Sequence, residues 1–186
     1  MQNALILAGG KSSRMGVDKT MLEFRGFASI THFLYDRLKV AFDDIKVATK
    51  QSKFNPSLPI LLDGFDEFAP IFVIANLDKH YHNPVFIIAA DTPLVEIKTI
   101  CELSNLNSPL ALASDGKHLH YLCGFYHPSV AIIARQMIQD GDLRLSNLAK
   151  KCGFKSLEFE NSKQFFNINT KDEYEKANIC SSISFL

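Results

Sequence analysis

Three cations, Lys11, Arg14 and Lys19, follow the glycine pair Gly9-Gly10 near the start of the chain. Glycine adopts backbone angles that other residues avoid, and it lets a ligand approach the main chain. Exposed backbone N–H groups combined with cations are a common binding site for phosphate. These residues therefore predict a phosphate-binding loop in which Arg14 and Lys19 supply positive charge.

This loop differs from the two best-known phosphate-binding motifs. The P-loop of nucleoside triphosphatases needs a glycine, four residues and then Gly-Lys-Ser/Thr, whereas Lys19 stands three places after Gly16. The dinucleotide fingerprint Gly-x-Gly-x-x-Gly is absent. A lone Gly-Gly pair also suits an ordinary turn between a strand and a helix. The prediction of phosphate binding therefore depends on the whole string of residues 4–19.

Two carboxylates end predicted strands further along the chain. The apolar run 59–63 ends on Asp63, and the longer run 84–91 ends on Asp91. Ligands of an open parallel sheet bind outside the carboxyl ends of its strands. Asp91 suits Mg²⁺, which commonly takes one carboxylate together with phosphate oxygens and water. The alternatives are that Asp91 caps the helix predicted after Pro93 and that Asp63 is an ordinary turn carboxylate.

Strands that alternate with helices over the first 115 residues predict parallel βαβ units, and hence a three-layer α/β domain with a mostly parallel sheet. The predicted strands are 4–7, 45–49, 59–63, 84–91, 109–113, a returning strand 121–126, and a late strand 156–159. The predicted helices are 29–42, 70 to about 80, 94 to about 106, 130–138, 145–152, and one that follows Thr170.

The end of the chain adds two amides to the candidate site. Asn167 and Asn169 lie two residues apart, and residues two apart in a strand face the same side. Both amides are therefore predicted to point into the site beside Asp91, where they suit an acceptor phosphate or a water on Mg²⁺. The alternative is a polar turn, because Thr170 and Glu173 form a capping box for the last helix.

The composition limits the classes of function. A chain of 186 residues with 47% hydrophobic residues predicts one domain, residues 1–186, with a real core. A net charge of zero argues against general binding of nucleic acid. The four cysteines form no Cys-x-x-Cys motif. Without a leader pattern or an apolar run near ~20 residues, we expect a cytoplasmic protein with no membrane partner.

The string Leu-Ala-Gly-Gly-x-Ser-x-Arg-Met-Gly-x-Asp-Lys, residues 7–19, resembles the signature of the molybdenum cofactor guanylyltransferases. These belong to the nucleotidyltransferases that make nucleoside-diphosphate sugars and related conjugates. The Asp18-Lys19 pair favours the guanylyl branch. Residues 90–93, Ala-Asp-Thr-Pro, are similar to the segment that supplies the metal-binding aspartate of the family. Residues 167–170 are similar to its Asn-x-Asn-Thr segment, so the resemblance spans most of the chain.

The resemblance implies a Rossmann-like nucleotidyltransferase fold that transfers GMP from GTP to the phosphate of a molybdopterin-type cofactor and releases pyrophosphate. It implies Mg²⁺ as cofactor, an N-terminal part that binds nucleotide and a C-terminal part that binds the acceptor. Proteins that mature molybdoenzymes are candidate partners. The implied nucleotide contacts are Leu7, Ala8, Gly9, Gly10, Lys19, Thr49, Asp63 and Asp91, the acceptor contacts are Asn167 and Asn169, the catalytic groups are Arg14, Lys19 and Asp91, and the metal ligand is Asp91.

Two departures from the family pattern bear on the choice of base. Residues 69–73 read Ala-Pro-Ile-Phe-Val where the family often has Gly-Pro-Leu-x-Gly, and Thr49 stands where an asparagine is frequent. One alternative is therefore transfer from CTP or to a sugar phosphate. Another is a regulatory domain that binds nucleotide without catalysis. The presence of Arg14, Lys19 and Asp91 together argues against this alternative, because binding alone would tolerate their loss. The acceptor phosphate needs no strong base, in keeping with the lack of an obvious Ser/His/Asp or paired-carboxylate site.

Overall fold

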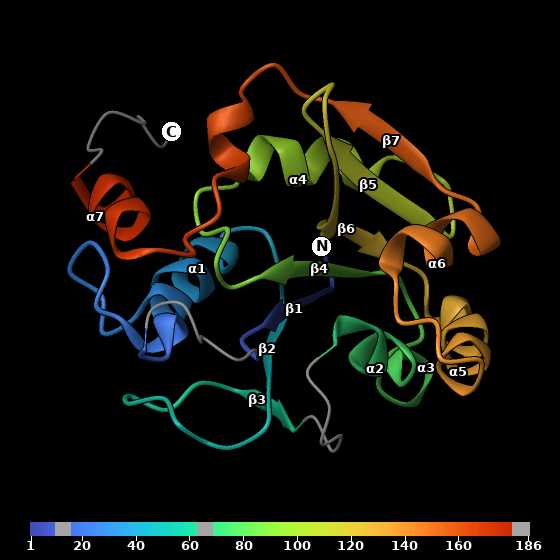
Figure 1. Cartoon of the computed structure of the whole chain (residues 1–186), viewed down its shortest axis with the longest axis horizontal. Coiled ribbons are helices and arrows are strands. Elements are labelled where there is room, and N and C mark those ends of the chain that lie inside the picture. The colour runs from blue at the N-terminus through green and yellow to red at the C-terminus, as the bar shows by residue number, and fades with distance from the viewer. Residues whose placement is uncertain (10–15, 63–68, 180–186) are drawn as a thin grey trace.

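A computed structural model describes residues 1–9, 16–62 and 69–179, and it shows one twisted sheet between layers of helices (Figure 1). In this part of the chain the strand order is β3-β2-β1-β4-β6-β5-β7, and β6 runs against the other six strands. The predicted mostly parallel α/β fold is confirmed. The strands are β1 (Asn3–Leu7), β2 (Asp44–Thr49), β3 (Ile60–Leu62), β4 (Val85–Ala89), β5 (Leu110–Ser114), β6 (Leu119–Tyr126) and β7 (Lys155–Glu158).

The helices cover both faces of the sheet. One face packs against α1 and α4, and the other packs against α2, α3, α5 and α6, which gather at the lower right of Figure 1. The helices are α1 (Ile30–Leu38), α2 (Pro70–Ile74), α3 (Leu77–His80), α4 (Ile97–Ser104), α5 (Ala131–Gln139), α6 (Leu145–Cys152) and α7 (Lys171–Ile179), with short 3-10 helices η1 (Lys19–Met21), η2 (Pro128–Val130) and η3 (Ser162–Phe165). Among the described residues, no helix is long and apolar enough to cross a bilayer.

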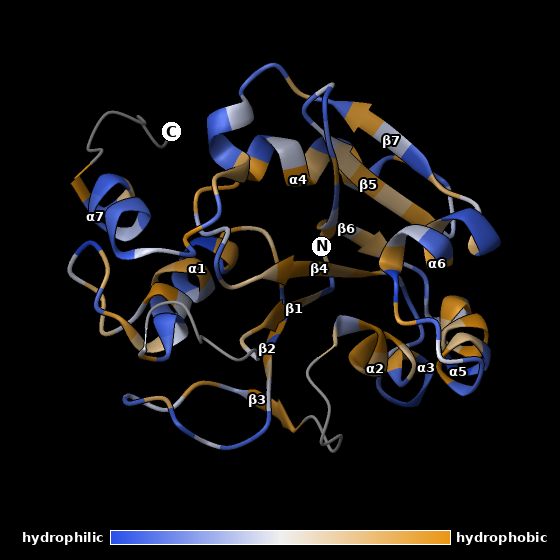
Figure 2. Cartoon of the chain, viewed as in Figure 1, coloured by the Kyte–Doolittle hydropathy of each residue, from blue (hydrophilic) through white to orange (hydrophobic). Residues whose placement is uncertain are grey.

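The central strands are apolar along their length because both of their faces are covered. Leu5 in β1 lies in register with Ile87 in β4, and both side chains are fully buried. Their neighbours Ile6 and Ile88 are fully buried on the opposite face. Figure 2 shows the same pattern as hydrophobic strands with hydrophilic outer helix faces. Truncation of such a core residue to alanine costs about 2–5 kcal/mol, so these strands hold the ends of the sheet rigidly.

The returning strand predicted at 121–126 is β6, and it inserts between β4 and β5. It needs a glycine at one point, because a Cβ at Gly124 would lie 2.4 Å from the carbonyl oxygen of Ala111. Real Cβ atoms do not approach backbone so closely. Gly124 therefore sets the close contact between β5 and β6, beside the register shift at Leu112/Ala113.

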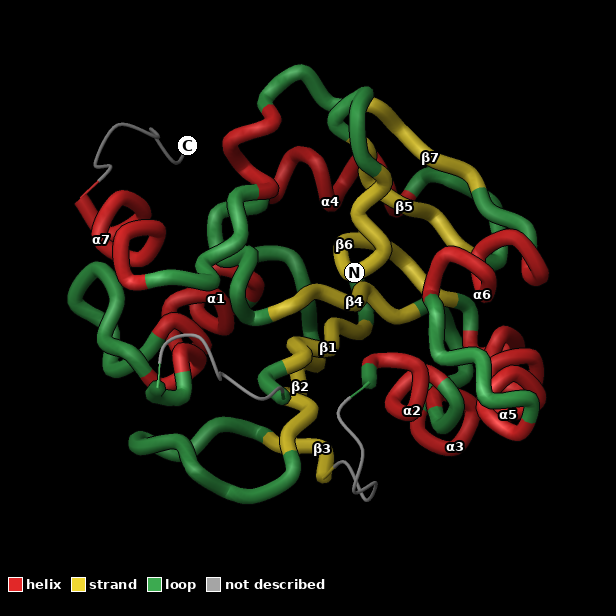
Figure 3. The backbone as a smooth tube through the Cα atoms, in the orientation of Figure 1, coloured by secondary structure: helices red, strands yellow, loops and turns green. Residues whose placement is uncertain are grey.

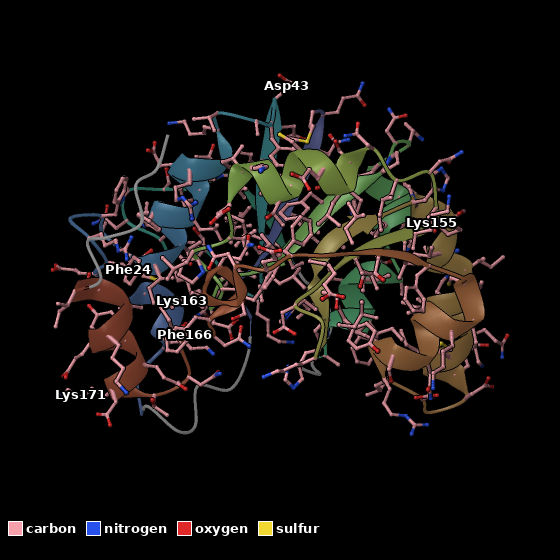
Figure 4. The ribbon with its side chains drawn as sticks, turned by 90° about the horizontal axis from the view of Figure 1, so that it is seen from above. Phe24, Asp43, Lys155, Lys163, Phe166 and Lys171 are labelled. Atoms are coloured by element: carbon pink, nitrogen blue, oxygen red, sulfur yellow. The ribbon has the colours of Figure 1, made fainter. Side chains whose placement is uncertain are left out.

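The last helix closes a small third core at the side of the sheet. Phe24, Phe33, Ile168 and Ala177 are buried together in this cluster. Arg25 donates two hydrogen bonds to the carbonyl of Ala177, at 2.7 and 3.2 Å, near the C-terminus of α7. Figure 4 places the labelled Phe24 and Phe166 near one another, on the side of the molecule where α7 lies. The C-terminal segment is thus fixed against the chain that follows Lys19.

Several helices are shorter than predicted, for local reasons. The helix predicted from 70 to about 80 is divided into α2 and α3, because the side-chain amide of Asn76 donates to the carbonyl of Phe72 while its backbone N–H bonds Val73. The helix predicted after Pro93 begins only at Ile97, and the carbonyls of Pro93 and Val95 accept hydrogen bonds from Arg37 instead.

Candidate active site

The carboxyl ends of β1, β2 and β4 lie at one edge of the sheet. Leu7 at the end of β1 is in register with Ala48 of β2 and with Ala89 of β4. The chain leaves β4 through residues 90–95, and η1 begins at Lys19. Open parallel sheets bind their ligands at this edge. The two segments that the sequence marks for chemistry therefore meet where the fold favours a ligand.

Lys19 stands at the centre of this edge. Its ammonium contacts Oδ2 of Asp91 at 2.6 Å and donates to Oδ1 of Asn169 at 2.8 Å. The side chains of Lys19 and Asp91 are 18% and 23% exposed, so solvent screens their ion pair only in part. The ammonium of Lys19 thus joins three predicted site residues that come from distant parts of the sequence.

The backbone around Lys19 is fixed by its neighbours. The carboxylate of Asp18 accepts from the backbone N–H of Thr20 at 3.0 Å and from its hydroxyl at 2.7 Å, which caps η1. The hydroxyl of Thr31 in α1 donates to the carbonyl of Thr20 at 2.9 Å. After η1, an isolated bridge pairs Phe24 with Phe27.

Asn167 also lies at this edge, although its segment forms no strand. Its Oδ1 accepts from the hydroxyl of Thr92 at 2.6 Å, and that hydroxyl also lies 3.3 Å from Oδ1 of Asp91. The backbone N–H of Ile168 donates to the carbonyl of Asp91 at 2.8 Å. Figure 3 shows this stretch as a loop between η3 and α7. Both amides therefore reach the surroundings of Asp91, through a loop that pairs with the backbone after β4.

Asp91 does not cap a helix in the described structure. The next helix, α4, begins at Ile97, and its N-cap position is Glu96. The alternative role considered for Asp91 is therefore wrong. Asp91 lies two residues after the end of the buried strand β4, so its carboxylate is held at the rim of the sheet.

The predicted capping box at the last helix is confirmed. Glu173 accepts from the backbone N–H groups of Asn169 and Thr170 at 2.8 and 2.9 Å, and its own N–H donates to the Thr170 hydroxyl at 3.3 Å. The hydrogen bond from Asn169, with the further bonds from Thr170, holds the pKa of Glu173 below its usual value. This box fixes the backbone of Asn169 while its side chain contacts Lys19, and the contact with an acceptor stays a prediction.

Leu7, Ala8 and Thr49, which are also predicted nucleotide contacts, lie at the same edge of the sheet. The backbones of Leu7 and Ala8 form hydrogen bonds with neighbouring strand ends. The N–H of Ala8 donates to the carbonyl of Ala48, and the carbonyl of Leu7 accepts from Ala90, both at 3.0 Å. Thr49 at the end of β2 is buried, and its hydroxyl donates to the carbonyl of Gln51 at 3.2 Å. Their contacts with a nucleotide stay predictions.

Gly9 leaves open space at the end of β1. A Cβ built there would meet no atom within 4 Å in the described structure, and its φ is not in the left-handed region. Neither packing nor backbone geometry therefore requires glycine at this position, which fits a role in letting a ligand approach. Gly10, Arg14 and Asp63, and Lys11 beside them, lie outside the described residues.

Sequence reasoning missed two side chains at this edge. Lys53, in the loop after β2, donates to the carbonyl of Ala8 at 3.0 Å and contacts the carboxylate of Asp18 at 2.6 Å. Thr92 joins Asp91 to Asn167. Thr92 stood inside a recognised segment, so its position was a usable signal. Lys53 follows no motif, and only the path of the loop brings it here.

The residues present fit one divalent ion at Asp91. Within the described residues no three His, Cys, Asp or Glu side chains gather into a metal site, so the protein itself would supply few ligands. Mg²⁺ accepts that arrangement, since phosphate oxygens and water complete its shell. Among the described residues, Oδ1 of Asp91 is contacted only by the Thr92 hydroxyl, at the long distance of 3.3 Å, which leaves lone pairs for an ion.

A family model described as a MobA-like NTP transferase domain matches residues 4–152. The fold and this edge of the sheet, together with that match, define the chain as a nucleotidyltransferase.

Individual relatives show which family of nucleotidyltransferases the chain resembles. A molybdenum cofactor guanylyltransferase of Campylobacter jejuni strain RM1221 is 31% identical over 180 residues, which covers 94% of each chain. One of Helicobacter pylori strain G27 is 31% identical over 183 residues, covering 93% of this chain and 90% of that one. The chain belongs to the molybdenum cofactor guanylyltransferase family.

A solved structure supports the fold. The molybdopterin-guanine dinucleotide biosynthesis protein A of Archaeoglobus fulgidus superposes with a TM-score of 0.81 at 19% identity, over 98% of this chain and 100% of that chain. The Rossmann-like arrangement implied by the sequence resemblance is therefore the observed one.

Proposed function

We propose that the chain transfers GMP from GTP to the phosphate of a molybdopterin-type cofactor and releases pyrophosphate, with Mg²⁺ bound at Asp91. Membership of the guanylyltransferase family supports the transfer and the two substrates. The predicted division, with nucleotide bound by the N-terminal part and acceptor by the C-terminal part, belongs to the same proposal. So do a cytoplasmic location and contact with proteins that mature molybdoenzymes.

The observation that carries this proposal is the shared contact at Lys19. One ammonium joins Asp91, which follows β4, to Asn169, which comes from the C-terminal segment. In this proposal, the nucleotide side and the acceptor side meet at this single positive charge. A transferase needs this arrangement, because two anions must be held together while a bond is exchanged.

The reaction needs few groups from the protein. An oxygen of the acceptor phosphate forms a bond to the α-phosphorus of GTP, the bond from that phosphorus to the bridging oxygen breaks, and pyrophosphate leaves with the electron pair. The acceptor loses its second proton with a pKa of about 6, so it is nucleophilic near neutral pH without a strong base. Lys19 offsets the negative charge of the phosphates, and Asn167 and Asn169 orient the acceptor.

Mg²⁺ when bound would neutralise phosphate charge and orient the triphosphate. Asp91 is the residue that would hold it, and Thr92 would orient the carboxylate through its hydroxyl. Gly9, Gly10, Leu7, Ala8, Thr49 and Asp63 are the proposed nucleotide contacts, and Arg14 is a second proposed charge-stabilising group.

The alternatives predict different products in one assay. We expect pyrophosphate release from GTP in the presence of molybdopterin and Mg²⁺, and little release from ATP, CTP or UTP. Release driven by CTP, or by a sugar 1-phosphate as acceptor, would place the chain in another branch of the fold. Nucleotide binding with no release of pyrophosphate from any combination of nucleotide and acceptor would favour the non-catalytic regulatory domain.

Base selectivity is the second prediction, measured by calorimetry with Mg²⁺ present. GTP is expected to bind at least about tenfold tighter than CTP, because a site built to hydrogen-bond one base leaves polar groups unpaired with another. Tighter binding of CTP would contradict guanylyl transfer and would give functional meaning to Thr49 and to residues 69–73.

The third prediction concerns the acceptor side. Asn169→Ala is expected to lower kcat/KM about tenfold, in the range for loss of a group that orients a catalytic side chain, while the affinity for GTP changes less than threefold. Asn161→Ala is a matched control, because Asn161 is exposed and its side chain hydrogen-bonds only the Glu96 carboxylate among the described contacts. Steady-state kinetics with each substrate varied in turn makes the comparison. If the Asn169→Ala enzyme were as active as the control, the role of Asn169 would be structural only.

A further inference from the structure

Lys53 occupies a position that the family resemblance does not assign. Its ammonium donates to three oxygens: the carbonyl of Ala8 at 3.0 Å, the carboxylate of Asp18 at 2.6 Å and the hydroxyl of Thr20 at 3.0 Å. An ammonium has three donors, so these contacts account for all of them. The side chain comes from the loop after β2, so the contact joins three separate pieces of the chain.

The burial of Lys53 sets it apart from the surface ion pairs. Its side chain is 16% exposed, close to the 18% of Lys19. Other lysines in ion pairs of the described structure are more exposed, for example Lys39 at 57% and Lys171 at 83%. The two most buried lysine ion pairs thus lie at the same edge of the sheet.

The contacts of Lys53 surround the proposed catalytic lysine in the sequence. Asp18 and Thr20 are the residues on either side of Lys19, and Ala8 directly precedes Gly9. The backbone direction of Lys19 is therefore set by two residues that share one ammonium.

Lys53 also supplies the counter-charge for the carboxylate of Asp18. A carboxylate next to Lys19 would repel an incoming triphosphate if it were left without a counter-charge. Burial alone would raise the pKa of Asp18, but hydrogen bonds from Lys53 and Thr20 outweigh it and hold the pKa below its usual value. The carboxyl is thus ionised, and Lys53 is the cation in contact with it.

We propose that Lys53 is a positioning residue for triphosphate binding: it neutralises Asp18 and holds Ala8, Asp18 and Thr20 together so that Lys19 points to the phosphates. The proposal rests on the proposed function for the identity of the nucleotide, but its charge argument applies to any polyphosphate.

A double substitution separates the charge role from simple packing. Lys53→Met is expected to weaken GTP binding about tenfold, because the Asp18 charge is then uncompensated. Asp18→Asn in the same chain is expected to restore the affinity to within about threefold of wild type. Asparagine keeps the Oδ1 acceptor that caps Thr20, removes the charge, and replaces the oxygen that faced Lys53 with an NH2 donor, which no longer meets an ammonium in the double variant. Lys39→Met is the matched control, since Lys39 pairs with Asp36 at 3.1 Å on the exposed end of α1.

Calorimetry with GTP, and in parallel with inorganic pyrophosphate as a probe for phosphate binding alone, gives the readout. Lys53→Met affinity equal to wild type for both probes would overturn the proposal, as would failure of Asp18→Asn to restore it. A wild-type chain that binds pyrophosphate but not GTP would defeat guanylyl transfer while leaving the Lys53 comparison intact. If Lys53→Met does not fold, Lys53→Gln takes its place: GTP binding about tenfold weaker than wild type supports the proposal, and binding equal to wild type contradicts it.

Discussion

Replacement of Asp91 with asparagine is expected to lower nucleotidyl transfer on the order of 10³-fold while the chain stays folded, the size of effect seen when a charge-stabilising group is lost in phosphoryl transfer. Asparagine keeps the shape of the side chain and an acceptor for Lys19, but it removes the charge that would hold a divalent ion. The variant should bind GTP in the absence of Mg²⁺ as the wild type does. It should lose the gain in affinity that Mg²⁺ gives the wild type.

Three measurements check this expectation: turnover, GTP affinity with and without Mg²⁺, and the thermal midpoint. Asp78→Asn is the matched control, because Asp78 forms an ion pair at 2.8 Å with Arg135 between α3 and α5, away from the carboxyl edge. If Asp91→Asn turned over as fast as this control, the charge of Asp91 would be dispensable, and accepting the hydrogen bond from Lys19 would be its whole role. A cap on α4 offers no alternative explanation, since that helix begins at Ile97.

Lys19→Ala is expected to lower turnover by on the order of 10²-fold, as for the loss of a preorganised charge-stabilising donor. The structure adds a cost in stability. Asp91 and Asn169 both lose the ammonium that they contact, and a partly buried polar group left without its partner costs about 1–3 kcal/mol. The thermal midpoint should therefore fall, although the folded variant should still be obtained.

The combination of Lys19→Ala with Asp91→Asn distinguishes a shared role from two separate ones. Groups that act as a unit give losses far smaller together than the product of the single losses. The double variant should therefore be little slower than Asp91→Asn alone. Lys39→Ala serves as the control for removal of a lysine from an exposed pair. A folded Lys19→Ala chain with activity near wild type would contradict the assigned role.

The strands of the fold could be predicted from the pattern of apolar residues, because the central strands are covered on both faces. Residues 84–91 read as a continuous apolar run, and β4 is the fully enclosed strand that such a run predicts. Helix limits followed less well. At Asn76 and at Pro93 the outcome depended on hydrogen bonds to Phe72 and Arg37. A periodicity argument does not contain such contacts.

The candidate site divides in the same way. Lys19 and Asp91 could be brought together from sequence because the carboxyl ends of parallel strands share one edge. Asn167 and Asn169 were placed correctly beside Asp91, although through a loop instead of a strand. Lys53 could not be found, because its contacts join loops that are distant in sequence and no local pattern marks them.

The most direct test of guanylyl transfer follows the label of GTP. The wild-type chain is incubated with Mg²⁺, molybdopterin and GTP carrying a radioactive phosphorus at either the α or the γ position. Guanylyl transfer predicts that the α label appears in a guanine dinucleotide of the cofactor and that the γ label appears in pyrophosphate, in equal amounts. Release of the γ label as inorganic phosphate, or an α label that never leaves free guanine nucleotides, would contradict it.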